Sequence, residues 1–323
     1  MKIVRIFLWG FMVLIIALAV TIIMNRGWVQ DYLRGRFYEP SVEMARIRSD
    51  LDLTERGEFL FNAAQPVLNE REDFNNNCRA GASVEIAVLG CYAGNNIYIY
   101  NITEKELDGI RELTTAHELL HAVYARMSED EKVALVEPLT RVFEANQEVL
   151  GEEIETYDTS EKQEELYVRA GTEIADLPAS LEKHYGEVFS DQDKIVAFYN
   201  KYIAVFKKLE TDMKTLKQEM EELQAVIDAK NAEYERRLEG LNARVDEFNK
   251  CAKTEGCFKT ETEFNVRRQV IVAEQEALNG LRDEINATID QYNVKVGEYN
   301  ENVFYNEQLN KIVNSSEKPD TIK

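Results

Sequence analysis

Residues 114–127, TTAHELLHAVYARM, hold two of the three histidines in this chain of 323 residues. His117 and His121 are four residues apart, so on a helix their side chains lie on one face, one turn from each other. Apolar residues accompany them at helical spacing, which predicts an amphipathic helix whose buried face the histidines border; they are Leu113, Ala116, Leu120, Val123 and Tyr124. Burying two imidazoles without partners is costly, and a shared metal ion removes that cost.

His117, Glu118 and His121 form the motif HExxH, in which each polar residue has a role in zinc-dependent hydrolysis. The two imidazoles can bind one Zn²⁺ ion, which lowers the pKa of a bound water to about 7. Glu118 projects about 100° around the helix from His117, which places its carboxylate within reach of that water. The motif therefore predicts a zinc-dependent peptidase in which Glu118 is the catalytic general base.

A catalytic zinc site needs a third protein ligand and keeps one position open. Residues 161–176, EKQEELYVRAGTEIAD, predict a later helix that carries carboxylates. With HExxH upstream, the chain resembles the gluzincins, metallopeptidases whose third zinc ligand is a glutamate on a later helix. The resemblance implies Glu173 as that ligand and Asp176 as the partner of a ligand histidine, although the two are three residues apart where the family usually has four. Glu165, eight residues before Glu173 on a nearby face, stays open as the alternative.

The resemblance covers residues 84–176 and also bears on how substrate is held. Residues 84–90 and 95–103 are rich in β-branched and aromatic residues and predict two short strands. The resemblance implies that the second strand, at 95–101, lies at the edge of a small sheet and holds an extended substrate. His184 and Tyr185 follow the predicted glutamate helix, and the resemblance implies that they stabilise an oxyanion during catalysis.

The last third of the chain predicts an antiparallel coiled-coil hairpin. Apolar residues recur at steps of three and four along 206–248 and again along 264–303, as coiled-coil core positions do. The two series are mirror-matched, because pairs of residue numbers sum to 512, as for Phe248 with Phe264, Leu241 with Ile271 and Leu216 with Val296. A constant sum is what two antiparallel arms of one chain require. We expect the hairpin at 199–312 and a disordered tail at 313–323.

The N-terminal residues predict a membrane anchor. Residues 6–24, IFLWGFMVLIIALAVTIIM, are long and apolar enough for a transmembrane helix and longer than the core of a signal peptide. We therefore assign residues 1–26 to a transmembrane anchor and residues 27–198 to a metallopeptidase-like domain.

The four cysteines form two close pairs, Cys78 with Cys91 and Cys251 with Cys257. In a chain with an export-like N-terminus, such pairs predict two disulfides in an oxidising compartment. The predicted localisation is thus a single-pass membrane protein whose C-terminal body lies outside the cytoplasm.

The predicted fold class is α+β and mainly helical. The formal net charge of −21 argues against a nucleic-acid partner, which requires a basic surface. The expected partners are a peptide or protein substrate, the membrane through the N-terminal helix, and a protein bound by the coiled-coil arm. A non-catalytic coiled-coil interaction or spacer protein with a structural or vestigial zinc site stays open as the alternative. Glu118 favours the peptidase, since a structural zinc site needs no general base.

Overall fold

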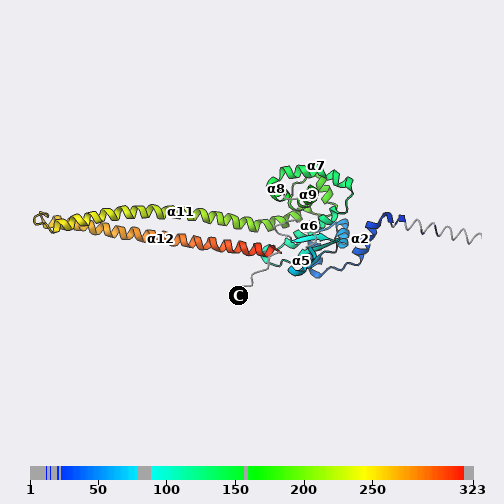
Figure 1. The fold of residues 1–323 in the computed structure, drawn as a ribbon, viewed down its shortest axis with the longest axis horizontal. Helices are drawn as coiled ribbons and strands as arrows, with labels where there is room; N and C mark the ends of the chain where they lie inside the picture. The colour runs from blue at the N-terminus through cyan, green and yellow to red at the C-terminus, as the bar shows by residue number, and fades with distance from the viewer. Residues whose placement is uncertain are drawn as a thin grey trace, which may run out of the picture. The chain divides into compact units, whose positions relative to one another are not determined.

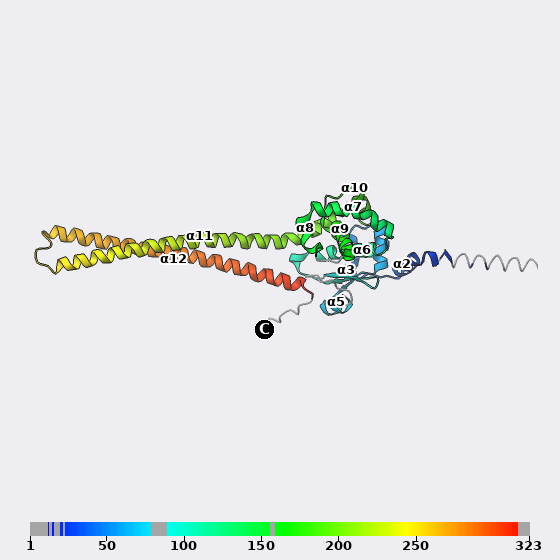
Figure 2. The same cartoon turned by 45° about the horizontal axis from the view of Figure 1, so that its top comes forward.

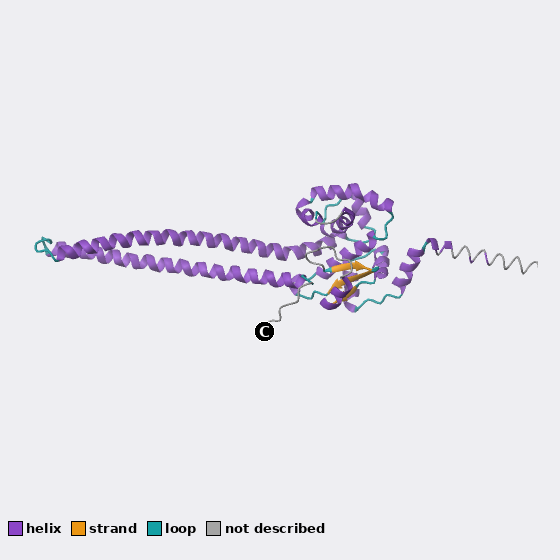
Figure 3. Cartoon of the chain, viewed as in Figure 1, coloured by secondary structure: helices purple, strands orange, loops and turns teal. Residues whose placement is uncertain are grey.

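The structure is a computed structural model, and it describes residues 23–78, 89–155 and 159–315, together with Met12, Ile15, Val20 and Thr21. The chain divides into two compact units, a larger unit of residues 1–205 and 309–323 and an arm of residues 206–308. Figures 1 and 3 show that helices dominate and that the strands are confined to one small sheet. The mainly helical character and the small sheet confirm these parts of the predicted fold class.

Helices account for most of the larger unit. Its described helices are α2 (Arg26–Arg36), α3 (Val42–Asp50), α4 (Glu55–Ala64), α5 (Arg71–Cys78), α6 (Ile110–Tyr124), α7 (Glu129–Ala145), α8 (Gln147–Ile154), α9 (Thr159–Glu173) and α10 (Ala179–Tyr185), with a 3₁₀ turn at Lys105–Leu107.

The described strands form one sheet in the order β1 (Val67–Asn69), β3 (Asn96–Tyr100), β2 (Gly90–Ala93). β3 pairs parallel with β1 and antiparallel with β2. Gly94 and Asn95 join β2 to β3 with φ values of 58° and 66°, the positive angles that a tight two-residue hairpin requires.

The strand predictions need one correction. A strand does form within 95–103, but β3 is the central strand and both of its edges are already paired. The prediction that residues 95–101 form the substrate-binding edge is therefore wrong, and β2 lies at the edge among the described strands. Of the strand predicted at 84–90, residues 84–88 lie outside the described residues.

α6 is the central helix of the larger unit. It packs against α9 on one side and against β2 and β3 on the other. Leu119 and Leu120 of α6 are fully buried, as are Ile97 and Ile99 of β3. Burying a leucine or isoleucine side chain stabilises a fold by about 1.5–3 kcal/mol, so this packing fixes the helix that carries the HExxH motif.

Helix ends follow local capping chemistry. Thr103 and Glu106 have the sequence pattern of a capping box, but α6 begins only at Ile110, after Gly109, whose φ is 98°. Ser128 and Glu131 have the same pattern and do form a capping box: the Ser128 side chain accepts from the backbone N–H of Glu131, and the Glu131 carboxylate accepts from the backbone N–H of Ser128.

The predicted membrane anchor requires a correction. Within the part of the chain that the structure describes, no helix has the length and apolarity needed to cross a membrane. Most of residues 6–24 lie outside the described residues. The transmembrane part of the predicted fold and the single-pass membrane localisation are accordingly not retained.

Most of α11 (Gln192–Ala252) and of α12 (Glu261–Val313) form the arm, where Figures 1 and 2 show the two helices side by side. The rings of Phe248 and Phe264 lie 5.1 Å apart between centroids, which places this predicted pair in contact. Lys230 pairs with Glu284 at 3.0 Å, so later residues of α12 face earlier residues of α11. The predicted long antiparallel helix pair is therefore confirmed.

Both predicted disulfides are present. Cys251, in the last turn of α11, is bonded to Cys257 in the loop at the tip of the arm. Cys78 at the end of α5 is bonded to Cys91 in β2, so a covalent link ties a surface helix to the strand beside α6.

Candidate metal centre

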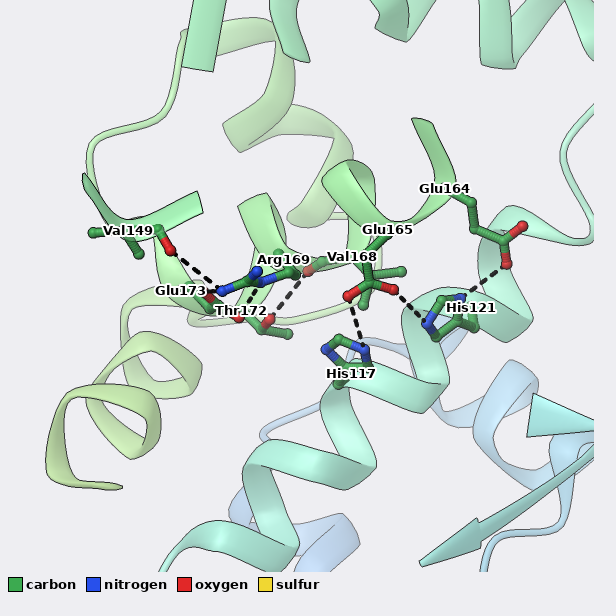
Figure 4. A network of polar contacts seen from close by, with 9 residues as sticks. All are labelled: His117, His121, Val149, Glu164, Glu165, Val168, Arg169, Thr172 and Glu173. Atoms are coloured by element: carbon green, nitrogen blue, oxygen red, sulfur yellow. Dashed lines mark hydrogen bonds and ion pairs between the residues drawn. The ribbon is translucent and has the colours of Figure 1, made fainter. Parts of the chain in front are cut away.

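Three side chains from α6 and α9 converge on one point, as Figure 4 shows. His117 Nε2 lies 3.6 Å from Oε1 of Glu165, and His121 Nε2 lies 3.5 Å from Oε2 of the same carboxylate. One ligand atom from each of the three residues falls within 4.8 Å of the others. Two imidazoles one turn apart on α6 thus face a single carboxylate of α9.

These separations fit a shared zinc ion. Two ligands that each lie about 2.0–2.1 Å from a tetrahedral Zn²⁺ are about 3.3–3.4 Å from each other. The two N···O distances, 3.6 and 3.5 Å, are close to that value and are longer than the usual 2.7–3.2 Å of a hydrogen bond. Two imidazoles and one carboxylate are also a donor set that catalytic zinc sites use.

Burial and neighbouring charges shift the pKa values of two of these residues, Glu165 and His117. Glu165 is only 5% exposed, and burial alone would raise its pKa. The neighbouring charges of His117, His121 and Arg169 instead lower the pKa of Glu165 to about 2. Burial lowers the pKa of His117 to about 4. At neutral pH both groups are therefore in the deprotonated forms that bind metals.

Glu164, the residue before Glu165, holds the outer nitrogen of His121. Its Oε1 lies 2.8 Å from His121 Nδ1, so the His121 ring lies between the carboxylates of Glu164 and Glu165. Burial lowers the pKa of His121, but the hydrogen bond with Glu164 and the nearby Glu165 and Glu118 carboxylates outweigh it and raise that pKa well above its ordinary value. A carboxylate on the outer nitrogen is the usual device for orienting a metal-ligating histidine. The motif-based prediction assigned this role to Asp176, which is exposed, and missed Glu164.

Glu118 is buried beside this cluster. Only 6% of it is exposed, and its charge contributes to the raised pKa of His121. On its other side it lies against the backbone of β2 at Gly90. The structure therefore brings the predicted general base to the two predicted histidine ligands.

Glu173, the predicted third ligand, is engaged elsewhere. Arg169 donates from Nε and Nη2 to the two carboxylate oxygens of Glu173, at 2.8 and 2.9 Å. Eight residues of helix separate Glu173 from Glu165, a rise of about 12 Å. A metal ion beside the two histidines therefore cannot be reached by both Glu165 and Glu173. Among the described residues, it is Glu165, the alternative that the sequence left open, and not Glu173 that lies with the two histidines.

His184 and Tyr185 lie with Tyr167 rather than with the metal-binding group. The Tyr185 hydroxyl is fully buried and donates to the carbonyl oxygen of Tyr167 at 2.6 Å. His184 Nε2 lies 3.2 Å from the Tyr167 hydroxyl, and the two rings meet edge to face. Because the Tyr185 proton is already committed to a carbonyl, the structure gives no support to the predicted oxyanion role of this pair.

No protein-family model matches the chain, and neither the curated proteins nor the solved structures contain a match to it. The function proposed below accordingly rests on the geometry of the site.

Proposed function

We propose that this protein is a zinc-dependent peptidase whose metal ligands are His117, His121 and Glu165 and whose general base is Glu118. One observation carries the proposal: the three-ligand cluster has a buried fourth group, Glu118, next to it. A structural zinc site completes its coordination with four protein ligands, whereas a catalytic site has three and an open position. Three converging ligands and an adjacent carboxylate are the composition of a hydrolytic site.

Bound zinc would supply a Lewis acid that acidifies water and polarises a carbonyl group. The protein groups have separate tasks around it. Glu118 accepts a proton from the attacking water and passes it to the departing amine. Glu164 keeps the His121 ring in one orientation through its 2.8 Å contact, so the metal-facing nitrogen stays in place.

The edge of the sheet supports a peptide as substrate. β2 packs against α6 and is one of the two edge strands among those described. The backbone groups on the outer side of an edge strand can pair with an extended chain laid beside it. Such pairing would align a peptide along β2, close to the helix that carries Glu118.

The substitution Glu118→Gln tests the proposal. It keeps the shape of the side chain but removes the base, so zinc should remain bound while hydrolysis of an unstructured peptide mixture falls by at least about 100-fold. The matched control is Glu112→Gln, which changes another buried glutamate of α6 in the same way and should leave hydrolysis intact. Undiminished hydrolysis in zinc-loaded Glu118→Gln protein would refute the proposed mechanism.

A further inference from the structure

Gly90 is the first residue of β2, and it is buried where that strand passes α6. A Cβ atom built on Gly90 would lie 2.6 Å from Cγ of Glu118, 2.7 Å from its Oε1 and 2.7 Å from Cγ2 of Thr114. Non-bonded carbon atoms prefer separations of about 3.5–4.0 Å. Because Gly90 has no side chain, the Glu118 side chain can occupy the space where a Cβ atom at position 90 would lie.

Position 90 requires glycine because of the space that Glu118 occupies and not because of the backbone conformation at this position. The glycines with positive φ in the described chain are Gly94, Gly109 and Gly256, and Gly90 is not among them. An alanine could adopt the same backbone angles, so its only penalty would come from the atoms that the new methyl group meets.

The strand cannot easily move away from α6. Gly90 is in register with Ile99 in the antiparallel pairing of β2 with β3, and the backbone N–H of Tyr100 donates to the carbonyl of Leu89 at 2.8 Å. The next residue, Cys91, is bonded covalently to Cys78. A methyl group at position 90 would thus displace the more mobile partner, the Glu118 side chain.

We infer that Gly90 is a positioning residue for Glu118, because its bare Cα leaves the carboxylate the room to stand beside the metal ligands. The inference rests on the proposed function, since it concerns the placement of the proposed general base. Gly90→Ala should leave the three ligands in place and move only the carboxylate. Its expected signature is a lower kcat with KM unchanged and the zinc content unchanged.

Acetohydroxamate binding tests the inference without relying on hydrolysis. This small chelator binds zinc and passes its proton to a nearby carboxylate, so its affinity reports whether Glu118 stands beside the metal. Calorimetry on the zinc-loaded full chain should show about tenfold or greater weakening in Gly90→Ala and in Glu118→Gln, the loss expected for one hydrogen bond to a charged group. The control is Gly280→Ala, where an added methyl meets nothing within 4 Å, and it should bind like the wild type.

The outcomes separate the inference from the proposed function. Wild-type affinity in Gly90→Ala with weak binding in Glu118→Gln would overturn the role of Gly90 alone. Wild-type affinity in Glu118→Gln would show that Glu118 does not stand beside the metal, which overturns both. Loss of zinc from folded Gly90→Ala protein would mean that Gly90 supports the ligands instead, and would also overturn the inference.

A second variant covers the case in which Gly90→Ala does not fold. Thr114→Ser removes Cγ2, one of the atoms 2.7 Å from the added Cβ, and gives the new methyl group room on that side. The comparison is then made in Thr114→Ser protein with and without Gly90→Ala. Weaker acetohydroxamate binding in the double variant supports the inference, and equal binding overturns it.

Discussion

At the residue scale, the two histidines of the site differ in their protonation. The pKa of His117 is lowered to about 4 by burial, whereas the hydrogen bond with Glu164 and the nearby Glu165 carboxylate raise that of His121 well above 6.5. In the metal-free protein, His117 therefore favours the neutral form and His121 the protonated form. Metal binding requires neutral imidazoles, so zinc must displace the proton of His121.

This difference predicts that zinc binding at pH 7 releases a proton from His121. Calorimetry in buffers with different ionisation enthalpies measures the number released. Glu164→Gln removes the charged partner that helps to raise the pKa of His121, so less proton release is expected in this variant. Equal release in the wild type and in Glu164→Gln would contradict the electrostatic account.

Without metal, the same shifts set the pH dependence of folding. The lowered pKa of His117 means that the unfolded chain takes up a proton that the folded chain lacks between pH 6.5 and about 4, so stability falls as the pH falls through that window. The raised pKa of His121 has the opposite effect on the pH dependence of stability. Its contribution is fully present below pH 6.5 and is lost as the pH rises through its folded value.

Sequence reasoning could identify His117, Glu118 and His121, because the helical period alone places all three on neighbouring faces. For the third ligand it chose Glu173 and left Glu165 as the alternative. Both lie on α9, and the choice depends on which turn of α9 meets α6 and on the pairing of Arg169 with Glu173. These are tertiary contacts, which no local pattern in residues 161–176 reveals.

At the element scale, the Cys78–Cys91 disulfide ties α5 to β2, the strand beside Glu118. We predict that replacing both cysteines by serine lowers the free energy of unfolding of the larger unit by about 2–4 kcal/mol, as the loss of a bridge over a loop of this length does. Hydrolysis should fall as well, because the strand that confines Glu118 is less firmly held. Urea unfolding and peptide assays on the same samples measure the two effects.

The matched control for this prediction is the second disulfide, Cys251–Cys257, which lies in the arm. Its double serine variant should lose arm stability and keep full hydrolysis of short peptides. If both double variants lost hydrolysis equally, the link between β2 and the site would not be supported.

The elements themselves were predictable to different degrees. The capping box at Ser128 and the long helices follow from local chemistry and spacing, which the sequence displays directly. The strand order was not predictable, because pairing of β3 with β1 joins residues about thirty positions apart. That pairing places β3 in the centre and leaves β1 and β2 at the two edges of the described sheet.

At the scale of the whole molecule, the chain has two compact units, and the proposed site lies entirely in the larger one. The mirror-matched residue numbers predicted the helix pair of the arm, because a constant sum is a property of the whole pair and is visible in the sequence. The membrane span predicted from residues 6–24 has no counterpart among the helices of the described residues.

The separation of the units predicts that the arm is dispensable for the chemistry. Deleting residues 212–300 and closing the gap with a short loop should leave zinc content and short-peptide hydrolysis unchanged. Cleavage of a natural protein substrate should weaken if the arm recruits that substrate. Loss of short-peptide hydrolysis in a deletion variant that still folds and binds zinc would show that the arm belongs to the catalytic machinery.

The most direct test of the central claim is the zinc content of two matched variants of α9. Glu165→Gln and Glu173→Gln make the same change two turns apart on one helix, and mass spectrometry of the metals gives zinc per chain. We predict one zinc per chain in the wild type and in Glu173→Gln and its loss in Glu165→Gln, because only Glu165 meets the two histidines. Zinc retained in Glu165→Gln and lost in Glu173→Gln would contradict the proposed site.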